Sequence, residues 1–470
     1  MDTIAAIATG SSPTAIGVVR VSGADCFSVC RRVFRSSRSF EALEPRKMVL
    51  GKILDAGGQV IDRVLAVRFP GPNSYTGEDS AEFHCHGSPI VLRELLAALF
   101  AAGAAGGTPV RQAGPGEFTK RAFLNGRMDL TQAEAVIDLI DAETAAAARN
   151  AAAQLDGGLR RRLEPVQEAL LEITSRFYAV VDYPDEDIED VKPEEVFAAL
   201  RSTEENLSGL LATCRRGRVL KKGVRTAIVG LPNAGKSSLL NALAGYERAI
   251  VTDVPGTTRD TVEESVLCGG VLLRLIDTAG LRETEDKVEK LGVERSRQAM
   301  ETADLILLVE DGAAEPDIVD EDIADEMDLQ EAVLRTGKPW IYIASKRDLS
   351  GMHWTSVSSL DGRVKPAACV SLSAVTGEGM EELEQAVAAL FPPGTPEEAG
   401  GLLTDRRQEE AVSRALAAVR RAREALENGL TPDAVLTDAE EALNAIGELT
   451  GRTAKEEIVS RIFSRFCVGK

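Results

Sequence analysis

The sequence predicts a protein that combines α/β and purely helical parts, and three observations carry this prediction. Short β-branched runs between Gly and Pro residues, such as residues 16–21 and 64–69, predict a mixed α/β segment up to about residue 120. Apolar residues at helical spacing dominate residues 128–215 and return after residue 401. Between these helical stretches, short apolar runs alternate with helical segments, which predicts a parallel, doubly wound sheet.

The simplest domain plan inserts the doubly wound α/β module into a helical domain whose two arms pack together. The length of 470 residues suggests about three domains at roughly 150 residues each. We expect an N-terminal α/β domain over residues 1–122 and the first helical part over residues 123–219. The inserted α/β module then covers residues 220–392, and the second helical part covers residues 393–470.

The charge balance excludes a general polyanion-binding protein. The chain has 54 Lys and Arg against 74 Asp and Glu, which gives a formal net charge of −20, and its average field repels phosphate. Aromatic residues make up only 4%, which disfavours a stacking platform for nucleic acid bases. A nucleotide or an RNA would therefore need a local site. The densest basic patch, either an RNA contact or a solvated linker, is Arg215, Arg216, Arg218, Lys221, Lys222 and Arg225.

The cysteines and the hydropathy favour a cytoplasmic protein. Seven cysteines, an odd number, lie scattered along the chain, which is not typical of a disulfide framework. We expect no secretory signal at the N-terminus and no membrane span, because no run of about 18 uncharged apolar residues is present. Cys26 and Cys30, one helical turn apart, are predicted to lie in the core. His84, Cys85 and His86 look like part of a metal site, but without further nearby ligands a structural or ligand-site role is favoured.

The first helical part begins near residue 130. Thr131 and Glu134 have the spacing of a capping box, which predicts a helix start there. Apolar residues at 3-4-3-4 spacing then predict one long helix with a single buried face. These residues are Leu163, Val166, Leu170, Ile173, Phe177 and Val180.

A phosphate-binding loop is the strongest functional signal. Residues 230–237, GLPNAGKS, match the G-x-x-x-x-G-K-[ST] pattern between a predicted strand and a predicted helix. The glycines let backbone N–H groups face the phosphates, Lys236 supplies positive charge, and the Ser237 hydroxyl can reach Mg²⁺. The predicted nucleotide contacts of this loop are Asn233, Ala234, Gly235, Lys236, Ser237 and Ser238.

Three further elements follow in the order that a GTPase needs. Residues 256–260, GTTRD, offer a hydroxyl to the metal, although spacing alone does not choose between Thr257 and Thr258. Residues 277–280, DTAG, end a strand, where Asp277 can hold the water shell of the metal. Residues 345–348, SKRD, resemble the N-K-x-D motif that reads guanine, and Ser373 with Ala374 resembles the second contact to the base. Together these motifs predict a guanine-nucleotide domain.

Two positions depart from the usual GTPase motifs. Ser345 replaces the Asn of the guanine reader, so support for the base and for the neighbouring loop should weaken. Asp348 can still accept hydrogen bonds from guanine N1–H and the 2-amino group, so guanine specificity should survive with some loss of affinity. Leu281 stands where many small GTPases have a Gln that orients the attacking water. The residues that could replace it are Arg282, Glu283, Glu285, Glu289 and Glu294.

The chain resembles the MnmE (TrmE) family of tRNA-modification GTPases from end to end. The matching stretches lie at residues 2–9 (DTIAAIAT), 17–23 (GVVRVSG), 69–87, 115–135, 231–245, 249–260, 277–296 and 462–470 (IFSRFCVGK). The resemblance implies an N-terminal folate-binding domain that forms a homodimer, a helical domain, and an inserted P-loop GTPase domain. It also implies that the chain acts with the FAD-dependent partner MnmG on carbon 5 of the tRNA wobble uridine. The one-carbon unit would come from 5-formyl-tetrahydrofolate or another tetrahydrofolate derivative, with GTP, Mg²⁺ and K⁺ as further ligands.

The resemblance also assigns residues in the GTPase domain. It implies that Thr258 binds Mg²⁺ and that Glu289 helps to orient the hydrolytic water. The implied K⁺ ligands are Asn233, Thr252, Val254 and Thr257, and hydrolysis would require the two GTPase domains of a dimer to meet. The remaining nucleotide contacts would be Asp253, Pro255, Gly256, Asp277, Thr278, Ala279, Gly280, Ser345, Lys346, Arg347, Asp348, Ser373, Ala374 and Val375.

The implied folate site combines residues from both ends of the chain. Its positions are Arg20, Glu82, Arg127 and the terminal Lys470. Glu82 can accept hydrogen bonds from a pterin, and the three cations can meet the carboxylates or carbonyls of a folate. Cys467 is either an inert small side chain or, beside a one-carbon donor, a nucleophile or proton carrier.

Two other functions remain as alternatives. A ribosome-assembly GTPase switch would share the phosphate loop, the DTAG motif and Leu281, but such factors usually add KH or OB-like RNA modules. No GXXG or RNP pattern is evident here. A dimerising scaffold that uses GTP only for mechanical change is the other alternative, and folate binding to residues 1–120 would distinguish it from the enzyme.

Overall fold

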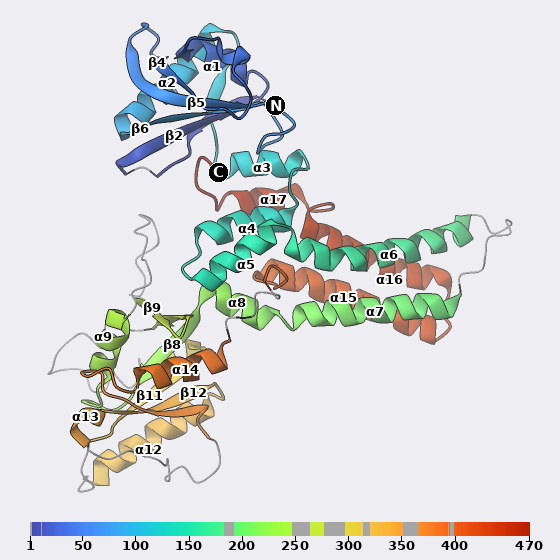
Figure 1. Ribbon diagram of the computed structural model, residues 1–470. Helices are drawn as coiled ribbons and strands as arrows, with labels where there is room; N and C mark the ends of the chain where they lie inside the picture. The colour runs from blue at the N-terminus through green and yellow to red at the C-terminus, as the bar shows by residue number, and fades with distance from the viewer. Residues whose placement is uncertain are drawn as a thin grey trace. The chain divides into compact units, whose positions relative to one another are not determined.

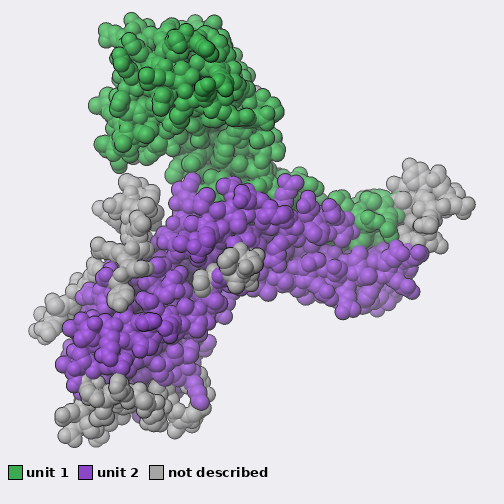
Figure 2. Space-filling model, in the orientation of Figure 1, with its two compact units in different colours: residues 1–137, 170–178, 436–470 green, residues 138–169, 179–435 purple. Residues whose placement is uncertain are grey.

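The computed structural model describes residues 2–10, 12–182, 192–246, 264–276, 297–313, 320–350, 365–392, 394 and 399–470. The chain forms two compact units (Figures 1 and 2). The first unit contains residues 1–137, 170–178 and 436–470, and the second contains residues 138–169 and 179–435. Among the described residues, every helix is too short or too polar to pass through a membrane.

The first unit is built on a seven-stranded sheet with the order β3-β4-β5-β6-β2-β1-β7. Its strands are β1 (Thr3–Ile7), β2 (Thr14–Ser22), β3 (Phe34–Arg35), β4 (Val49–Leu54), β5 (Val60–Phe69), β6 (Ser80–Gly87) and β7 (Val110–Gln112). Neighbouring strands are antiparallel except β1 and β7, which are parallel. The register places Arg20 of β2 directly opposite Glu82 of β6. The predicted mixed α/β segment is thereby confirmed.

Two helices bury the core of this sheet. Helices α1 (Cys26–Val33) and α2 (Pro89–Ala105) pack against each other and against the strands, near the 3-10 turn η1 (Phe40–Ala42). Their apolar faces join Phe83 and other strand residues in one buried cluster. Cys26 and Cys30 are fully buried in this cluster, as the sequence predicts.

Helices complete the first unit. They are α3 (Glu117–Leu124), part of α4 (Leu130–Ile140), part of α6 (Gly158–Asp182), part of α16 (Pro432–Thr450) and α17 (Glu456–Phe463). The predicted capping box at Thr131 and Glu134 is wrong. Asp129 caps α4, since its Oδ1 accepts from Gln132 N at 2.9 Å and Gln132 Oε1 accepts from Asp129 N at 3.1 Å. Thr131 lies inside the helix and is 1% exposed, so the same box pattern occurs two residues earlier with Asp and Gln.

The second unit contains a six-stranded sheet with the order β13-β12-β11-β8-β10-β9. Its strands are β8 (Val224–Val229), β9 (Glu264–Cys268), β10 (Val271–Leu275), β11 (Leu305–Asp311), β12 (Trp340–Ser345) and β13 (Ala368–Ser371). All neighbours are parallel except β9 and β10. This confirms the parallel sheet predicted from the alternating apolar runs.

Helices cover both faces of the second sheet, as a doubly wound fold requires. Among the described residues, the named helices that lie wholly in this unit are α5 (Ala145–Leu155), α7 (Pro193–Leu211), α8 (Cys214–Lys222), α9 (Lys236–Tyr246), α12 (Asp320–Arg335), α13 (Arg347–Ser350), α14 (Met380–Leu390) and α15 (Arg406–Glu427). Two separate apolar clusters form, one with Leu239 and Leu383 and the other with Met300 and Val333.

The helical arms before and after the second sheet pack together. Helices α7 and α15 pack along each other. The Glu204 carboxylate on α7 forms ion pairs with two arginines of α15, 2.8 Å from Arg420 Nε and 3.0 Å from Arg423 Nε. Figure 1 shows the two helices side by side. The chain enters the sheet after α8 and leaves it after α14, so the sheet is inserted between two parts of the helical bundle.

Candidate functional site

The phosphate-loop motif lies between β8 and α9. Gly230 has no room for a side chain, because a Cβ there would lie 2.1 Å from the carbonyl oxygen of Val309. Asn233 and Gly235 have φ of 62° and 93°, which lets the loop turn back over the start of α9 at Lys236. A tight loop that leads into a helix N-terminus suits an anionic group such as phosphate.

The Lys236 ammonium lies over this loop. Its Nζ donates to the carbonyl oxygens of Gly230 at 2.9 Å and Leu231 at 2.6 Å. Burial lowers the pKa of Lys236 below its usual range, because the charged form loses hydration. Neighbouring phosphates would offset this loss of hydration with negative charge.

The motif that resembles a guanine reader lies at the same edge of the sheet, because β8, β12 and β13 are parallel and their carboxyl ends meet there. Ser345 ends β12 and donates from Oγ to the carbonyl oxygen of Ala234 at 2.6 Å. A Cβ at Gly235 would lie 3.0 Å from Ser345 Oγ, so the two loops are in close contact. The hydroxyl therefore keeps one link to the phosphate loop, although the Asn of other GTPases is missing.

Contacts of the neighbouring residues fix the shape of the predicted guanine-reading loop, residues 345–348. Lys346 has φ of 56°, and its Nζ lies 2.5 Å from Oδ2 of Asp311 at the end of β11. Arg347 N donates to Leu372 O at 3.2 Å, and Asp348 at the start of α13 is exposed. Sequence reasoning missed Asp311, although its place directly after the apolar run of β11 was a usable signal.

The second base-contact motif is an ordered turn after β13. The Ser373 hydroxyl is buried and accepts hydrogen bonds from Val375 N at 3.3 Å and Thr376 N at 3.2 Å. Ala374 is half-buried, whereas Val375 is 84% exposed. The phosphate loop, residues 345–348 and residues 373–375 are thus arranged around one edge of the sheet.

The remaining predicted nucleotide and metal residues lie outside the described residues. They are Thr252, Asp253, Val254, Pro255, Gly256, Thr257, Thr258, Asp277, Thr278, Ala279, Gly280 and Glu289, together with Leu281, Arg282, Glu283, Glu285 and Glu294. Their assignments stay predictions from the sequence.

In the first unit, Arg20 and Glu82 form an ion pair. Arg20 Nε lies 2.8 Å from Glu82 Oε1, and both side chains are largely shielded from solvent. The Arg20 guanidinium also lies 5.6 Å from the ring centroids of Tyr75 and Phe118, within cation–π range. Sequence reasoning missed both rings, although each lies inside a stretch that matches the family.

The C-terminal tail reaches the same place. Cys467 O accepts from Gly116 N at 3.3 Å, and Lys470 O accepts from Phe118 N at 3.1 Å. Gly469 has φ of 101°, and its carbonyl oxygen lies 3.4 Å from Arg20 Nη1. The backbone therefore brings Lys470 to the Arg20–Glu82 pair across the whole length of the sequence, while Cys467 stays exposed.

Arg127 occupies a different part of this region. It is exposed, and its Cγ lies 3.4 Å from the position of a Cβ built on Gly77. Asn125, two residues earlier, donates from Nδ2 to Thr76 O at 2.7 Å and holds the two loops together. Within the described residues, no hydrogen bond or ion pair joins Arg127 to the Arg20–Glu82 pair.

His84 adds a polar atom without a hydrogen bond beside Glu82. Its Nε2 is buried and makes no hydrogen bond within the described residues, and it lies 3.4 Å from Glu82 Oε2. A buried ring nitrogen without a hydrogen bond is costly, so a bound polar ligand that forms one would satisfy it. Residues Arg20, Glu82 and His84 thus fit a polar heterocycle with donor and acceptor groups.

His84, Cys85 and His86 are consecutive on β6, but their side chains differ in burial and in neighbours. Cys85 is buried, and burial raises the pKa of its thiol to about 12. His86 is exposed and its Nδ1 lies 2.8 Å from Asp62 Oδ1. The three side chains therefore have three separate surroundings.

At least three of the six residues in the basic patch predicted at residues 215–225 form ion pairs, and residues 214–222 form α8 rather than a solvated linker. Lys221 Nζ lies 2.7 Å from Asp138 Oδ1 and 2.8 Å from Asp405 Oδ2. Two further paired members are Arg218, 3.3 Å from Glu409, and Arg225, 3.1 Å from Asp304. Arg215 and Arg216 line a cavity with other arginines.

Comparison with known proteins covers the whole chain. Residues 3–127 match the family described as GTP-binding protein TrmE N-terminus, and residues 130–467 match the family described as MnmE helical domain. The tRNA modification GTPase MnmE of Akkermansia muciniphila is 43% identical over 472 residues, which cover 100% of this chain and 99% of that protein. The protein of the same name from Acetivibrio thermocellus is 38% identical over 473 residues, with 100% and 99% covered.

A solved structure, that of the G domain of the T. maritima FeoB iron transporter, matches 35% of this chain and 97% of that chain at 28% sequence identity and a TM-score of 0.25. Two family descriptions account for both ends and the middle of the chain, and the relatives align over their full length. The chain belongs to the MnmE (TrmE) family of tRNA modification GTPases.

Proposed function

We propose that this chain couples GTP hydrolysis to modification of carbon 5 of the wobble uridine in tRNA. It would add an aminomethyl or carboxymethylaminomethyl group together with the FAD-dependent partner MnmG. The relatives that share its full length are named tRNA modification GTPases. The observation that carries the proposal is the contact between the phosphate loop and the guanine-reading loop, where Ser345 meets Ala234. Scattered, unpaired cysteines further support a cytoplasmic location.

The proposed domain plan assigns one task to each part. Residues 1–122 would bind folate and form a homodimer, and residues 220–392 would bind GTP. Residues 123–219 and 393–470 would form the helical frame between them. The packing of α7 on α15 supports this frame.

Within the GTPase part, Lys236 would neutralise charge on the β- and γ-phosphates, and Asp348 would accept hydrogen bonds from guanine. Ser237 and Thr258 would hold Mg²⁺, which supplies positive charge to the phosphate oxygens. Leu281 cannot orient a water, so Glu289 takes that role in the proposal.

A monovalent cation would complete the GTPase site. An amide oxygen from Asn233, with hydroxyl and carbonyl oxygens from Thr252, Val254 and Thr257, suits a hard cation such as K⁺. Positive charge near the phosphates favours the transition state for hydrolysis. Dimerisation of two GTPase domains would order these residues around the nucleotide.

The proposed folate site is formed by Arg20, Glu82, Arg127 and Lys470. The Arg20–Glu82 pair, the adjacent His84 Nε2 and the rings of Tyr75 and Phe118 offer polar and flat surfaces that suit a pterin. Bound tetrahydrofolate would supply the one-carbon unit. The exposed Cys467 lies in the tail segment that Gly116 and Phe118 hold, which supports a role as a nucleophile or proton carrier.

Two measurements test the function. In cells that lack the gene, liquid chromatography and mass spectrometry of tRNA nucleosides should show an unmodified wobble uridine, and the wild-type gene but not a K236A gene should restore it. An unchanged wobble uridine in the deletion strain would contradict the proposal. Separately, the purified chain should bind 5-formyl-tetrahydrofolate, and E82Q should weaken binding while E41Q, an exposed residue of the same unit, should not.

A further inference from the structure

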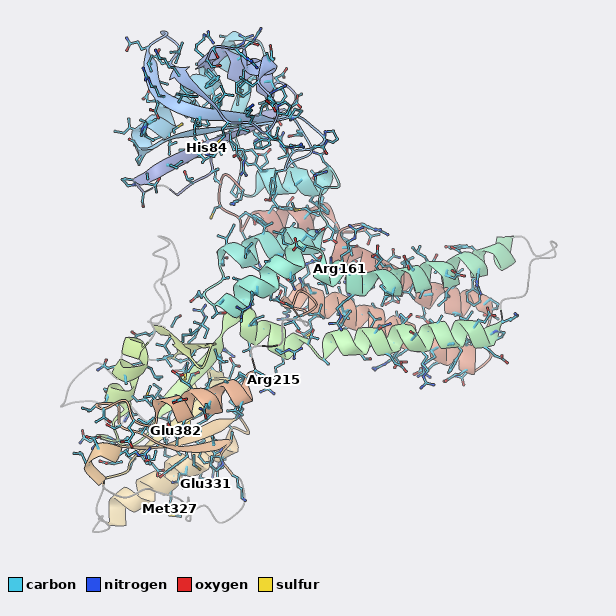
Figure 3. The ribbon with its side chains drawn as sticks, viewed as in Figure 1. His84, Arg161, Arg215, Met327, Glu331 and Glu382 are labelled. Carbon is cyan, nitrogen blue, oxygen red and sulfur yellow. The ribbon has the colours of Figure 1, made fainter. Side chains whose placement is uncertain are left out.

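A cavity lined by arginines lies in the second unit, away from the nucleotide loops. Its volume is about 820 Å³, and its walls come from α6, the end of α7 and the turn after it, α8, the end of α14 and the segment before α15. Arg161 and Arg162 line it from α6, and Arg215 and Arg216 line it from α8. Figure 3 labels Arg161 and Arg215, which come from these two helices.

Local contacts hold the arginines in position. Arg161 donates to the carbonyl oxygen of Asp156 at 2.6 Å, and Arg162 donates to that of Gly401 at 2.8 Å. The Arg215 guanidinium lies 6.0 Å from the ring centroid of Phe391. These contacts use carbonyl groups and an aromatic ring, so they orient the guanidinium groups without neutralising them.

The electrostatic setting distinguishes this cavity from the rest of the molecule. The chain has a formal net charge of −20, yet the described residues that line the cavity include four arginines and no Asp or Glu. The nearby cations Arg218, Lys221 and Arg225 are all within 3.3 Å of a carboxylate oxygen. Within the described residues, Arg161, Arg162 and Arg215 form no ion pair, so positive charge is concentrated at this cavity.

We propose that this cavity binds backbone phosphates of the tRNA substrate. Guanidinium groups suit phosphate because they present several donors in one plane. The cavity offers little stacking surface for a base, because Phe391, the one aromatic ring among its described lining residues, is 5% exposed and lies under Arg215. Arg161, Arg162 and Arg215 are exposed, so a polymer can reach them. The inference rests on the proposed function, because it takes tRNA as the substrate.

The experiment measures binding of a labelled, unmodified tRNA transcript to the nucleotide-free full chain between 50 and 200 mM NaCl. R161Q/R215Q should weaken binding about tenfold at 100 mM and make the slope of log K against log salt less negative by about two, since each phosphate contact contributes about 0.9. The control R201Q/R406Q removes the same charge from exposed positions on α7 and α15 and should bind like the wild type. R161K/R215K, which keeps the charge, should keep most of the salt dependence.

Basal GTP hydrolysis and the melting temperature of R161Q/R215Q should match the wild type. Equal tRNA binding by R161Q/R215Q and the wild type would overturn the cavity assignment and leave the proposed function intact. A wild-type chain that fails to bind tRNA at 50 mM NaCl would contradict both.

The same experiment distinguishes tRNA from two other occupants of the cavity. If inorganic tripolyphosphate occupies one more site on the wild type than on R161Q/R215Q, where the phosphate loop is intact, and tRNA affinity is unchanged, this would show a small-anion site and overturn the RNA assignment. The second alternative is an intramolecular ion pair between the cavity arginines and Glu397 or Glu398, which follow Pro392 in the sequence. If they are the true partners, E397Q/E398Q and R161Q/R215Q would lower the melting temperature alike without changing tRNA affinity, which would also count against the proposal.

Discussion

The hydroxyl of Ser345 donates a 2.6 Å hydrogen bond to the carbonyl oxygen of Ala234, and this bond joins the predicted guanine-reading loop to the phosphate-loop motif. Ser345 is 4% exposed, so the carbonyl cannot easily exchange this partner for water. The substitution of Ser for Asn thus keeps the contact between the loops, although a hydroxyl offers fewer hydrogen bonds than an amide.

S345A should weaken guanine-nucleotide binding and destabilise the second unit by about 1 kcal/mol, the net value of one buried hydrogen bond. Binding of fluorescent GDP and thermal unfolding would measure the two effects. T302A is a matched control, because its exposed hydroxyl also donates to backbone carbonyls, those of Gln298 and Ala299. Unchanged nucleotide affinity in S345A would show that the link between the loops does not support the nucleotide site.

Asp348 should determine base specificity. Its exposed carboxylate can accept from guanine N1–H and the 2-amino group, whereas adenine lacks this pair of donors. GTP should therefore displace fluorescent GDP at much lower concentrations than ATP, and D348N should reduce guanine affinity by at least about tenfold, the equivalent of about 1.4 kcal/mol. D328N, on the exposed side of α12, should retain it. Competition by ATP on equal terms with GTP would contradict the assignment.

GTP hydrolysis should depend on the monovalent cation. The wild type should hydrolyse GTP faster in KCl than in NaCl at equal ionic strength, because K⁺ beside Asn233 would stabilise charge on the phosphates. N233A should remove most of the difference between the two salts. Equal wild-type rates in both salts would argue against a K⁺ site.

Cys467 should be needed for tRNA modification but not for GTP hydrolysis. The tail holds this exposed cysteine near the proposed folate site, so C467S should reduce wobble-uridine modification in cells and leave the GTPase rate unchanged. C369S changes an exposed cysteine of the second unit and should behave like the wild type. Full modification activity in C467S would exclude a catalytic role.

The stability of the first unit should fall in acid through Glu117. Burial opposes ionisation of this carboxyl, but hydrogen bonds from Arg111, Gly114 and Arg121 outweigh it and lower its pKa to about 2. A pKa lowered from 4.5 adds stability above pH 4.5, and this stability is lost as the pH falls toward 2. At neutral pH, E117Q should therefore speed amide exchange of β1 and α3 relative to the wild type, and the difference should shrink below pH 4.5.

E94Q, a change at an exposed carboxylate on α2, is the control for this acid effect. A difference between E117Q and the wild type that stays constant from pH 7 to pH 3 would show that the Glu117 charge does not contribute.

The sequence alone was enough to predict the fold class, the inserted GTPase module and the family. These features depend on local sequence patterns. The eight-residue motif of a phosphate loop binds phosphate through its own backbone, and short apolar runs that alternate with helical segments indicate buried strands. The same patterns predicted the buried positions of Cys26 and Cys30. The order of the motifs along the chain then identified the nucleotide without any knowledge of contacts.

Only the tertiary structure decided which distant groups are partners. It brings Gly469 to Arg20 and joins Ser345 to Ala234, pairs that lie far apart in the sequence. It also divides the predicted basic patch, placing Lys221 against Asp138 and Asp405 while Arg215 faces the cavity with Arg161. The sequence identifies a charged residue but not its surroundings. The effect of the charge depends on the carboxylates, carbonyls and solvent that folding places around it, and local sequence does not specify those neighbours.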